Sequence, residues 1–144
     1  MIRFLLNHSN LKEIITNVEI KILTDENEIQ KCIDLFNSEI IWDSMFNIQI
    51  ALDRIKKGEL LFAAYKNKNI FSYCWLQQRN NNEYYLYNVF SKKSNTLRKV
   101  GVIDLLYLVI KYYTKGTILV EIDEWNTQSQ KVANKLGFNI IENS

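Results

Sequence analysis

Apolar and polar residues follow two different periodicities along the 144-residue chain. Alternation with period two, as in residues 18–22, predicts a strand with one buried face. Apolar residues three and four positions apart, such as Ile29 and Ile33, predict an amphipathic helix that begins after a cap at Thr24 or Asp25. The rest of the chain is interpreted by the same two rules. Strands are predicted at 18–22, 60–65, 70–76, 84–90, 118–122 and 138–141, and further helices at about 46–57, 102–113 and 127–136.

The turns between these segments predict how the strands are arranged. Short polar turns at 67–69 and 79–82 join three strands in a row, which predicts an antiparallel meander. The helix at 102–113 is apolar almost all round, as expected of a helix buried against a sheet. We therefore predict an α/β fold with a mixed, mainly antiparallel sheet flanked by helices.

The length of the chain predicts one domain, residues 1–144. Residues 1–17 carry strand-like and helix-like apolar groups in turn, so they are treated as an N-terminal extension of unassigned form. The sequence does not fix the oligomeric state, and a homodimer remains an open alternative.

Composition and charge exclude several classes of protein. A net charge of +2, with mixed charges along the chain, does not favour nucleic-acid binding. Cys32 and Cys74 have apolar neighbours and are expected to be buried thiols. The only histidine, His8, lies in the extension, which argues against a zinc site and against a Ser-His-Asp triad. No signal peptide and no apolar run of about 18 residues is evident, so a cytoplasmic protein without a membrane span or metal is expected.

A basic loop, residues 91–101, leads into the helix at 102–113. Its four cationic residues have no acidic neighbour within the loop. The N-terminus of a helix presents unpaired amides and positive partial charge, which suits a phosphate group. Two interpretations stay open here: a phosphate site, or a solvated loop that is basic by chance.

The segment from Asn126 to Phe138 is the most specific part of the sequence. Asn126, Ser129 and the run Lys-Leu-Gly-Phe at 135–138 resemble the GNAT acyltransferase superfamily, whose pattern is Asn-x-x-(Ala/Ser) followed by Lys-Leu-Gly-Phe. The resemblance covers residues 18–141. It implies a sheet splayed between its fourth and fifth strands, with the pantetheine arm of coenzyme A in the splay. A simpler alternative makes 136–138 a helix stop and a core aromatic, but it leaves Asn126 unexplained.

The phosphate loop of the family reads (Gln/Arg)-x-x-Gly-x-(Gly/Ala). Arg98, Gly101 and Val102 fit the resemblance, whereas Ile103 stands where a small residue is expected. A branched side chain there is expected to crowd the cofactor or to shift it outward. The resemblance implies acetyl-CoA or another acyl-CoA as cosubstrate. The cofactor-binding residues that it implies are Val89, Arg98, Lys99, Gly101, Val102 and Asn126.

The resemblance is weaker at the residues that would perform chemistry. Ala133 occupies the position of a family tyrosine that protonates the departing thiolate, so Ser129, solvent or another tyrosine would have to substitute. Glu83 resembles the general base of histone-type members, with a hinge carboxylate at the 79–82 turn as the alternative. Glu121 and Asp123 are further candidates for the base.

Aromatic residues in the predicted helices and sheet are candidates for the acceptor site, although aromatics at strand spacing also commonly form a core. The resemblance implies acyl transfer to an amine of an unidentified small molecule or protein. The alternative is a GNAT-like binding module without turnover, suggested by Ile103 and Ala133 together. The aromatic candidates for contacts with the acceptor are Trp42, Tyr73, Tyr85 and Tyr87.

Overall fold

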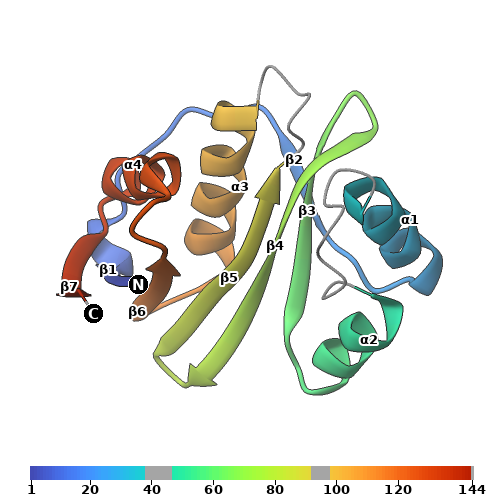
Figure 1. Cartoon of the computed structure of the whole chain (residues 1–144), viewed down its shortest axis with the longest axis horizontal. Coiled ribbons are helices and arrows are strands. Elements are labelled where there is room, and N and C mark those ends of the chain that lie inside the picture. The colour runs from blue at the N-terminus through green and yellow to red at the C-terminus, as the bar shows by residue number, and fades with distance from the viewer. Residues whose placement is uncertain (38–46, 92–97, 144) are drawn as a thin grey trace.

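The computed structural model describes the backbone of residues 1–37, 47–91 and 98–143 (Figure 1). Seven described strands form one sheet in the order β2-β3-β4-β5-β6-β1-β7. All neighbours in it are antiparallel except β5 and β6, so the predicted fold class is confirmed. The strands are β1 (Ile2–Asn7), β2 (Glu19–Ile22), β3 (Leu60–Lys66), β4 (Asn69–Asn80), β5 (Glu83–Ser91), β6 (Thr117–Ile122) and β7 (Asn139–Asn143). The helices are η1 (His8–Asn10, a 3-10 turn), α1 (Glu26–Asn37), α2 (Ile48–Lys56), α3 (Arg98–Tyr113) and α4 (Thr127–Leu136).

The N-terminal extension, left unassigned by the sequence, contains strand β1. It lies between β6 and β7 and pairs antiparallel with both. Ile2, Phe4 and Leu6 are buried, while Arg3 and Asn7 are exposed, which is the alternation of a strand with one core face. The structure thus adds an interior strand, next to the edge strand β7, to the predicted sheet.

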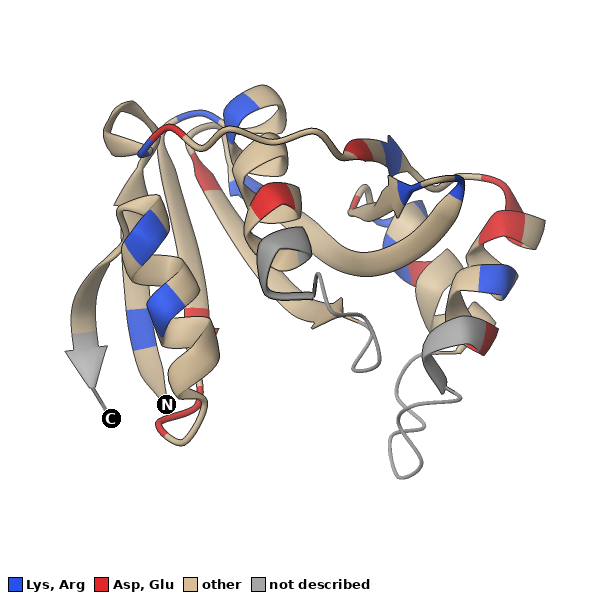
Figure 2. Cartoon of the chain, turned by 90° about the horizontal axis from the view of Figure 1, so that it is seen from above, with Lys and Arg blue, Asp and Glu red and all other residues tan. Residues whose placement is uncertain are grey.

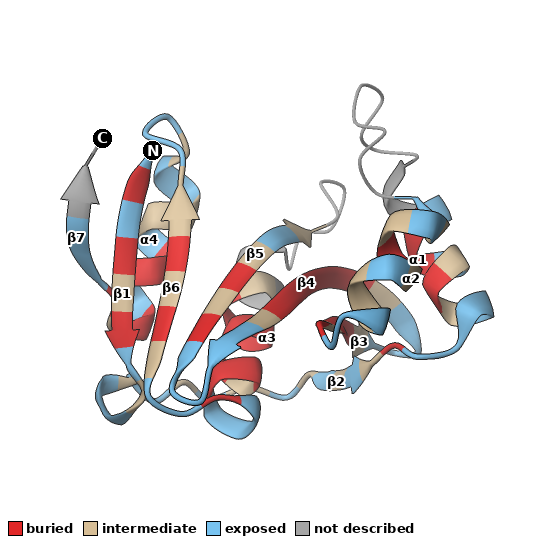
Figure 3. Ribbon diagram, turned by 90° about the horizontal axis from the view of Figure 1, so that it is seen from below, coloured by how far each residue is buried: buried red, intermediate tan, exposed pale blue. Residues whose placement is uncertain are grey.

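Different helices pack on the two faces of the sheet, and alternate residues of β3 contribute to the core on each face. Leu61 and Ala63 point into a cluster formed with α1 and α2, whereas Phe62 and Ala64 point into a cluster formed with α3. Figure 3 shows α1 and α2 over the β3–β4 part of the sheet and α3 and α4 behind β5, β6 and β1. The face of β5, β6 and β1 opposite α3 and α4 is therefore not covered by a described helix.

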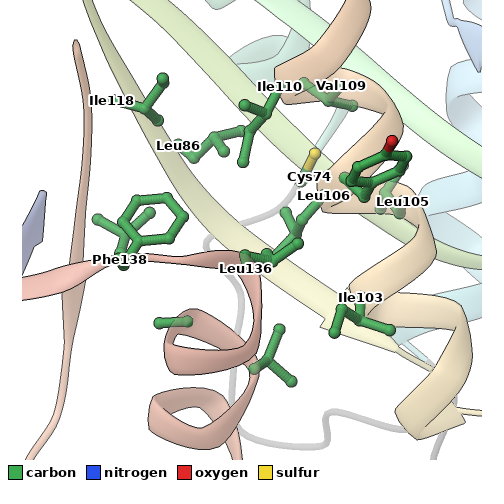
Figure 4. Close-up of a cluster of buried hydrophobic side chains, with 14 of the residues drawn as sticks. Cys74, Leu86, Ile103, Leu105, Leu106, Val109, Ile110, Ile118, Leu136 and Phe138 are labelled. Atoms are coloured by element: carbon green, nitrogen blue, oxygen red, sulfur yellow. The ribbon is translucent and has the colours of Figure 1, made fainter. Parts of the chain in front are cut away.

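The larger cluster fills the space between α3, α4 and the sheet (Figure 4). Leu105 and Ile110 of α3 and Leu136 of α4 are fully buried in this cluster. Cys74 belongs to this cluster and Cys32 to the smaller one, so the expectation of buried free thiols is confirmed. Burial raises the pKa of the Cys32 thiol to about 12, which keeps it protonated at neutral pH.

Among the described helices, none has the length and apolar character needed to cross a lipid bilayer.

Candidate functional site

A splay in the sheet separates β5 from β6. The two strands are paired in parallel only where Glu83, Tyr84 and Tyr85 face residues 117–119. Beyond this point β5 continues to Ser91 and β6 to Ile122 without pairing to each other, and Figure 3 shows them diverging. This is the splay that the resemblance implied, between the fourth and fifth strands when β1 is not counted.

A cavity of about 360 Å³ occupies the splay. Apolar side chains from the sheet, α3 and α4 line it together with polar side chains from β5, β6 and the start of α4. The lining residues are Met1, Tyr85, Leu86, Tyr87, Asn88, Val89, Val102, Leu106, Val120, Glu121, Ile122, Asp123, Asn126, Ser129, Val132, Ala133, Leu136 and Phe138.

A bulge in β5 lies beside this cavity. Tyr87 pairs with Trp75 and Phe90 with Tyr73, so β5 contains one residue more than β4 over this stretch. Asn88 has φ +48°, a left-handed conformation that asparagine tolerates better than most residues. A bulge interrupts the hydrogen-bonded ladder and bends its strand, so the sequence at Asn88 helps β5 to leave β6.

Another wall of the cavity is formed by α4, from its cap at Asn126 to its last residue, Leu136. The Asn126 side chain caps this helix, because its Oδ1 accepts a hydrogen bond from the backbone N–H of Ser129 at 3.1 Å. Ser129 and Ala133 follow at helical spacing and both line the cavity. Ala133 thus presents a methyl group at the position where the family carries a tyrosine.

Two stacked tyrosines stand on the uncovered side of the splay. The rings of Tyr85 and Tyr87 lie 5.1 Å apart and 7° from parallel. The Tyr85 hydroxyl donates to Glu121 Oε1 at 3.0 Å, and Arg3 Nε donates to Glu121 Oε2 at 3.1 Å. Partial burial opposes ionisation of Glu121, but these two donors outweigh it and hold the pKa of Glu121 below its ordinary value. Burial, followed by the hydrogen bond to Glu121, raises the pKa of Tyr85 to about 12.

The second tyrosine of the pair, Tyr87, is hydrogen-bonded to a different carboxylate, that of Glu59. The Tyr87 hydroxyl donates to Glu59, whose side chain is only 8% exposed. Burial and this hydrogen bond raise the pKa of Tyr87 above its ordinary value. Arg54 of α2 lies 5.0 Å from the ring centres of both Trp75 and Tyr87, and its Nη1 donates to Asn88 Oδ1 at 3.0 Å. One arginine thus connects α2, the tyrosine pair and the bulge.

The cavity brings together six of the side chains that the sequence singled out: Tyr85, Tyr87, Val89, Val102, Asn126 and Ser129. Glu121 and Asp123, the further candidates for the base, line it as well. Their roles remain predictions.

Other predicted site residues lie elsewhere. Glu83 is exposed and pairs with Thr117 at the closed end of the splay, outside the cavity lining. Tyr73 is 5% exposed in the smaller core cluster, where it stacks on Phe90. Trp42 lies outside the described residues, and of Arg98, Lys99 and Gly101 only the helical backbone is described.

Ile103 does not line the cavity. Its side chain is 8% exposed and packs in the larger core cluster, where Figure 4 shows it beside α4. Val102, one position earlier, faces the cavity instead. The sequence alone also did not indicate Arg3, Arg54 or Glu59. Arg3 and Glu59 reach the site across strand neighbours whose register the sequence does not reveal.

Several solved structures that are similar to this chain carry the name of an acetyltransferase, and others are proteins of unknown function. No protein-family model and no curated protein matches the chain. An N-acetyltransferase from Staphylococcus aureus Mu50 is similar over 88% of this chain and 84% of its own, at 23% identity and a TM-score of 0.69. A functionally unknown conserved protein from Staphylococcus epidermidis is similar over 97% of this chain, at 10% identity and a TM-score of 0.68. The present chain spans 57% of that protein's length.

A third similar structure contains a ligand. It is a putative acetyltransferase from Salmonella typhimurium with its cofactor acetyl-CoA, at 14% identity and a TM-score of 0.62 over 85% of this chain and 79% of its own. At these identities the likeness concerns the fold. The splayed sheet, the helices on its two faces and the likeness to these structures agree with the resemblance seen at Asn126–Phe138, and the chain has the fold of the GNAT superfamily.

Proposed function

We propose that the protein transfers an acyl group, acetyl or a related one, from a coenzyme A thioester to an amine. The observation that carries this proposal is the cavity in the splay between β5 and β6. Beyond Tyr85 and Leu119 the facing edges of the two strands no longer bond to each other. Unpaired backbone groups favour a ligand that brings its own amides, and the pantetheine arm of coenzyme A is a narrow chain with two amides.

The two walls of the cavity have complementary roles in this proposal. Val89 lies at the bulge and lines the cavity, so its backbone groups are our candidates for binding the thioester carbonyl. Asn126 uses its carbonyl oxygen to cap α4, which leaves its NH₂ group as a donor toward the cavity. The apolar side chains of Val120 and Val132 line the path between them.

The acceptor amine approaches from the sheet face that α3 and α4 do not cover, where Tyr85, Tyr87 and Glu121 line the cavity. Since the pKa of Glu121 is lowered, its carboxylate is ionised at neutral pH and attracts the ammonium form of an acceptor. The amine must lose a proton before it attacks the carbonyl carbon, and Glu121 and Asp123 are the carboxylates in the cavity lining that can accept it. The sulfur must gain a proton as the carbon–sulfur bond breaks. With alanine at position 133, the proton for the sulfur can come from Tyr85, which lines the cavity and stays protonated at neutral pH.

Two of the neighbours support this proposal by their stated activity or ligand: the Staphylococcus aureus N-acetyltransferase and the Salmonella typhimurium protein with acetyl-CoA. Their acceptors do not transfer to this chain, so the amine is proposed only as a class.

Calorimetry with acetyl-CoA and with acetyl-pantetheine tests cofactor binding, and release of free thiol in the presence of separate amine pools tests turnover. Saturable binding with amine-dependent thiol release is expected. At about 100 times its dissociation constant, the ligand should also stabilise the fold by about 2.7 kcal/mol. Absence of binding at millimolar concentration would overturn the proposal. Binding without thiol release from any pool would instead favour the module without turnover.

A further inference from the structure

The corner between α2 and β3 contacts Tyr87 at two points. Arg54, in the last turn of α2, lies 5.0 Å from the centre of the Tyr87 ring. Glu59, just before β3, accepts a hydrogen bond from the Tyr87 hydroxyl. The backbone N–H of Glu59 in turn donates to the carbonyl of Arg54 at 3.0 Å. The two side chains that contact Tyr87 therefore belong to one folded corner of the chain.

The guanidinium of Arg54 contacts aromatic rings and an amide together. It lies 5.0 Å from the ring centre of Trp75 as well, and Trp75 is fully buried in the smaller core cluster. Its Nη1 donates to Asn88 Oδ1 at 3.0 Å. Positive and negative side chains are interspersed over the described elements in Figure 2, so the contribution of Arg54 depends on these local contacts rather than on a large basic surface.

Asn88 has a backbone conformation that its surroundings must support. Among the described residues other than glycine, positive φ occurs at Asn67 and Lys68, in the β3–β4 turn, and at Asn88, inside strand β5. A left-handed residue inside a strand is unfavourable unless other contacts hold it there. The hydrogen bond from Arg54 is such a contact, and Val89, the next residue, lines the cavity. Arg54 therefore connects α2 to the backbone that leads into the cavity wall.

We propose that Arg54 is a positioning residue for the acyl group: its hydrogen bond to Asn88 holds the bulge in the conformation in which the backbone at Val89 binds the thioester carbonyl. Arg54 is not among the described residues that line the cavity, so it acts through Asn88. A role in packing alone would explain its contacts with Trp75 and Tyr87, but it leaves the bond to the bulge without a use. The inference rests on the proposed function, because it adds a residue to the same site.

Arg79 provides a matched control on the other tyrosine of the stacked pair. It lies 4.3 Å from the centre of the Tyr85 ring, and its Nε donates to Gln77 Oε1 at 3.3 Å. Like Arg54, it is a cation next to a stacked tyrosine, but this hydrogen bond goes to a side chain of β4 and not to the bulge. Arg79→Ala therefore removes a similar cation–π contact without the bond that the inference requires.

Calorimetry with two ligands isolates the contribution of the carbonyl: acetyl-CoA, and S-ethyl-CoA, a thioether that lacks the carbonyl oxygen. The parent should bind acetyl-CoA about tenfold more tightly than S-ethyl-CoA. Arg54→Ala should reduce this preference to about twofold and leave the affinity for S-ethyl-CoA within about twofold of the parental value. Arg79→Ala should keep the full preference.

Variants of Asn88 test the same bond from its other side. Asn88→Gly keeps the left-handed backbone and removes the acceptor, so it should lose the preference as Arg54→Ala does, and it tests the bond even if Arg54→Ala fails to fold. Asn88→Asp keeps an acceptor oxygen and should retain the preference. Because both changes remove one bond, the double variant of Arg54→Ala and Asn88→Gly should lose no more than either single variant.

A measurement on the free protein separates positioning from cofactor binding. Backbone order parameters of Val89 from NMR relaxation should fall in Arg54→Ala but not in Arg79→Ala. Unchanged order parameters in Arg54→Ala, or the full preference for acetyl-CoA in both Arg54→Ala and Asn88→Gly, would overturn the inference and leave the proposed function standing. Equal affinity of the parent for the two ligands would also overturn it while acetyl-CoA binding stands. If the parent binds neither ligand, the proposed function and this inference fall together.

Discussion

Gly116 is the residue at which one added methyl group should perturb the sheet most. It has φ +76°, and a Cβ there would lie 2.2 Å from the carbonyl oxygen of Asn82 and 2.8 Å from its Cβ. The same carbonyl accepts the N–H of Thr117 at 2.8 Å, the contact that seats the start of β6 beside the β4–β5 turn. Gly116→Ala must therefore move backbone at the closed end of the splay.

The expected loss of unfolding free energy has two parts. A left-handed backbone costs a residue with a Cβ about 1–2 kcal/mol relative to glycine. Displacement of Asn82 adds the loss of the hydrogen bond to Thr117, about 1 kcal/mol, and the strain of moving packed backbone. We expect Gly116→Ala to lower the unfolding free energy by about 3–4 kcal/mol in total.

Gly58 separates the two parts. It has φ +95°, but a Cβ there would meet no atom within 4 Å, so Gly58→Ala carries the backbone cost without the collision. Urea denaturation followed by circular dichroism should show a loss of about 1 kcal/mol for Gly58→Ala and about 2 kcal/mol more for Gly116→Ala. If the two variants lose the same free energy within about 0.5 kcal/mol, the assigned contact between Gly116 and Asn82 is refuted.

Three further variants test the site and its surroundings. Asn126→Ser keeps a good helix cap, so it should unfold like the parent while Asn126→Ala loses about 1 kcal/mol, yet both should bind acetyl-CoA more weakly in calorimetry. Parental affinity in the serine variant would reduce Asn126 to a cap. Glu121 has a lowered pKa in the folded state, so its stabilisation is present above the unfolded-state pKa of about 4.3 and is lost as the pH falls through the folded-state pKa. Glu121→Gln should thus be less stable at pH 7 and lose less stability on acidification, and thermal melts with an unchanged acid slope would contradict this. Asp104 is 1% exposed, and this burial raises the pKa of its carboxyl group. The hydrogen bond from Thr16 and the charge of Lys66 lower that pKa, but by less. Ionisation of Asp104 therefore destabilises the fold as the pH rises above the pKa of this group in the unfolded state. The variant Asp104→Asn should have a higher melting temperature than the parent at pH 7 but not at pH 3. A lower melting temperature at pH 7 would refute the raised pKa of Asp104.

Most of the fold was predicted because its signals are local. The turn at 67–69 places Asn67 and Lys68 at positive φ, and the structure forms the β3–β4 hairpin there. The position of β1 was not predicted for two reasons. Leu5 interrupts the apolar–polar alternation, and the partners of β1 lie far away in the sequence, with Arg3 and Glu121 separated by 118 positions.

The sequence predicted those parts of the candidate site that lie within one short segment. It missed contacts that depend on how distant strands are aligned with each other. Asn126 and Ser129 are three positions apart, so the cap of α4 and the cavity wall beside it could be predicted from one short segment. The bond between Tyr87 and Glu59 joins residues 28 positions apart across β4. Tyr73 and Tyr87 look alike in sequence, but Tyr73 lies under α1 and α2 whereas Tyr87 lines the cavity, a difference set by packing.

The placement of β1 couples the two ends of the sheet during folding. In the described sheet, β7 is hydrogen-bonded to β1 and to no other strand. It can therefore join the sheet only after β1 has paired with β6. That docking closes a loop of more than a hundred residues, which is entropically costly and makes the step slow compared with formation of the β3–β4–β5 meander. Residues 2–7 are translated long before residues 117–122, their partners in β6, and a chain emerging from the ribosome carries Phe4 and Leu6 unpaired over that interval. We therefore expect the half of the sheet that holds α4 and its wall of the cavity to be assembled last.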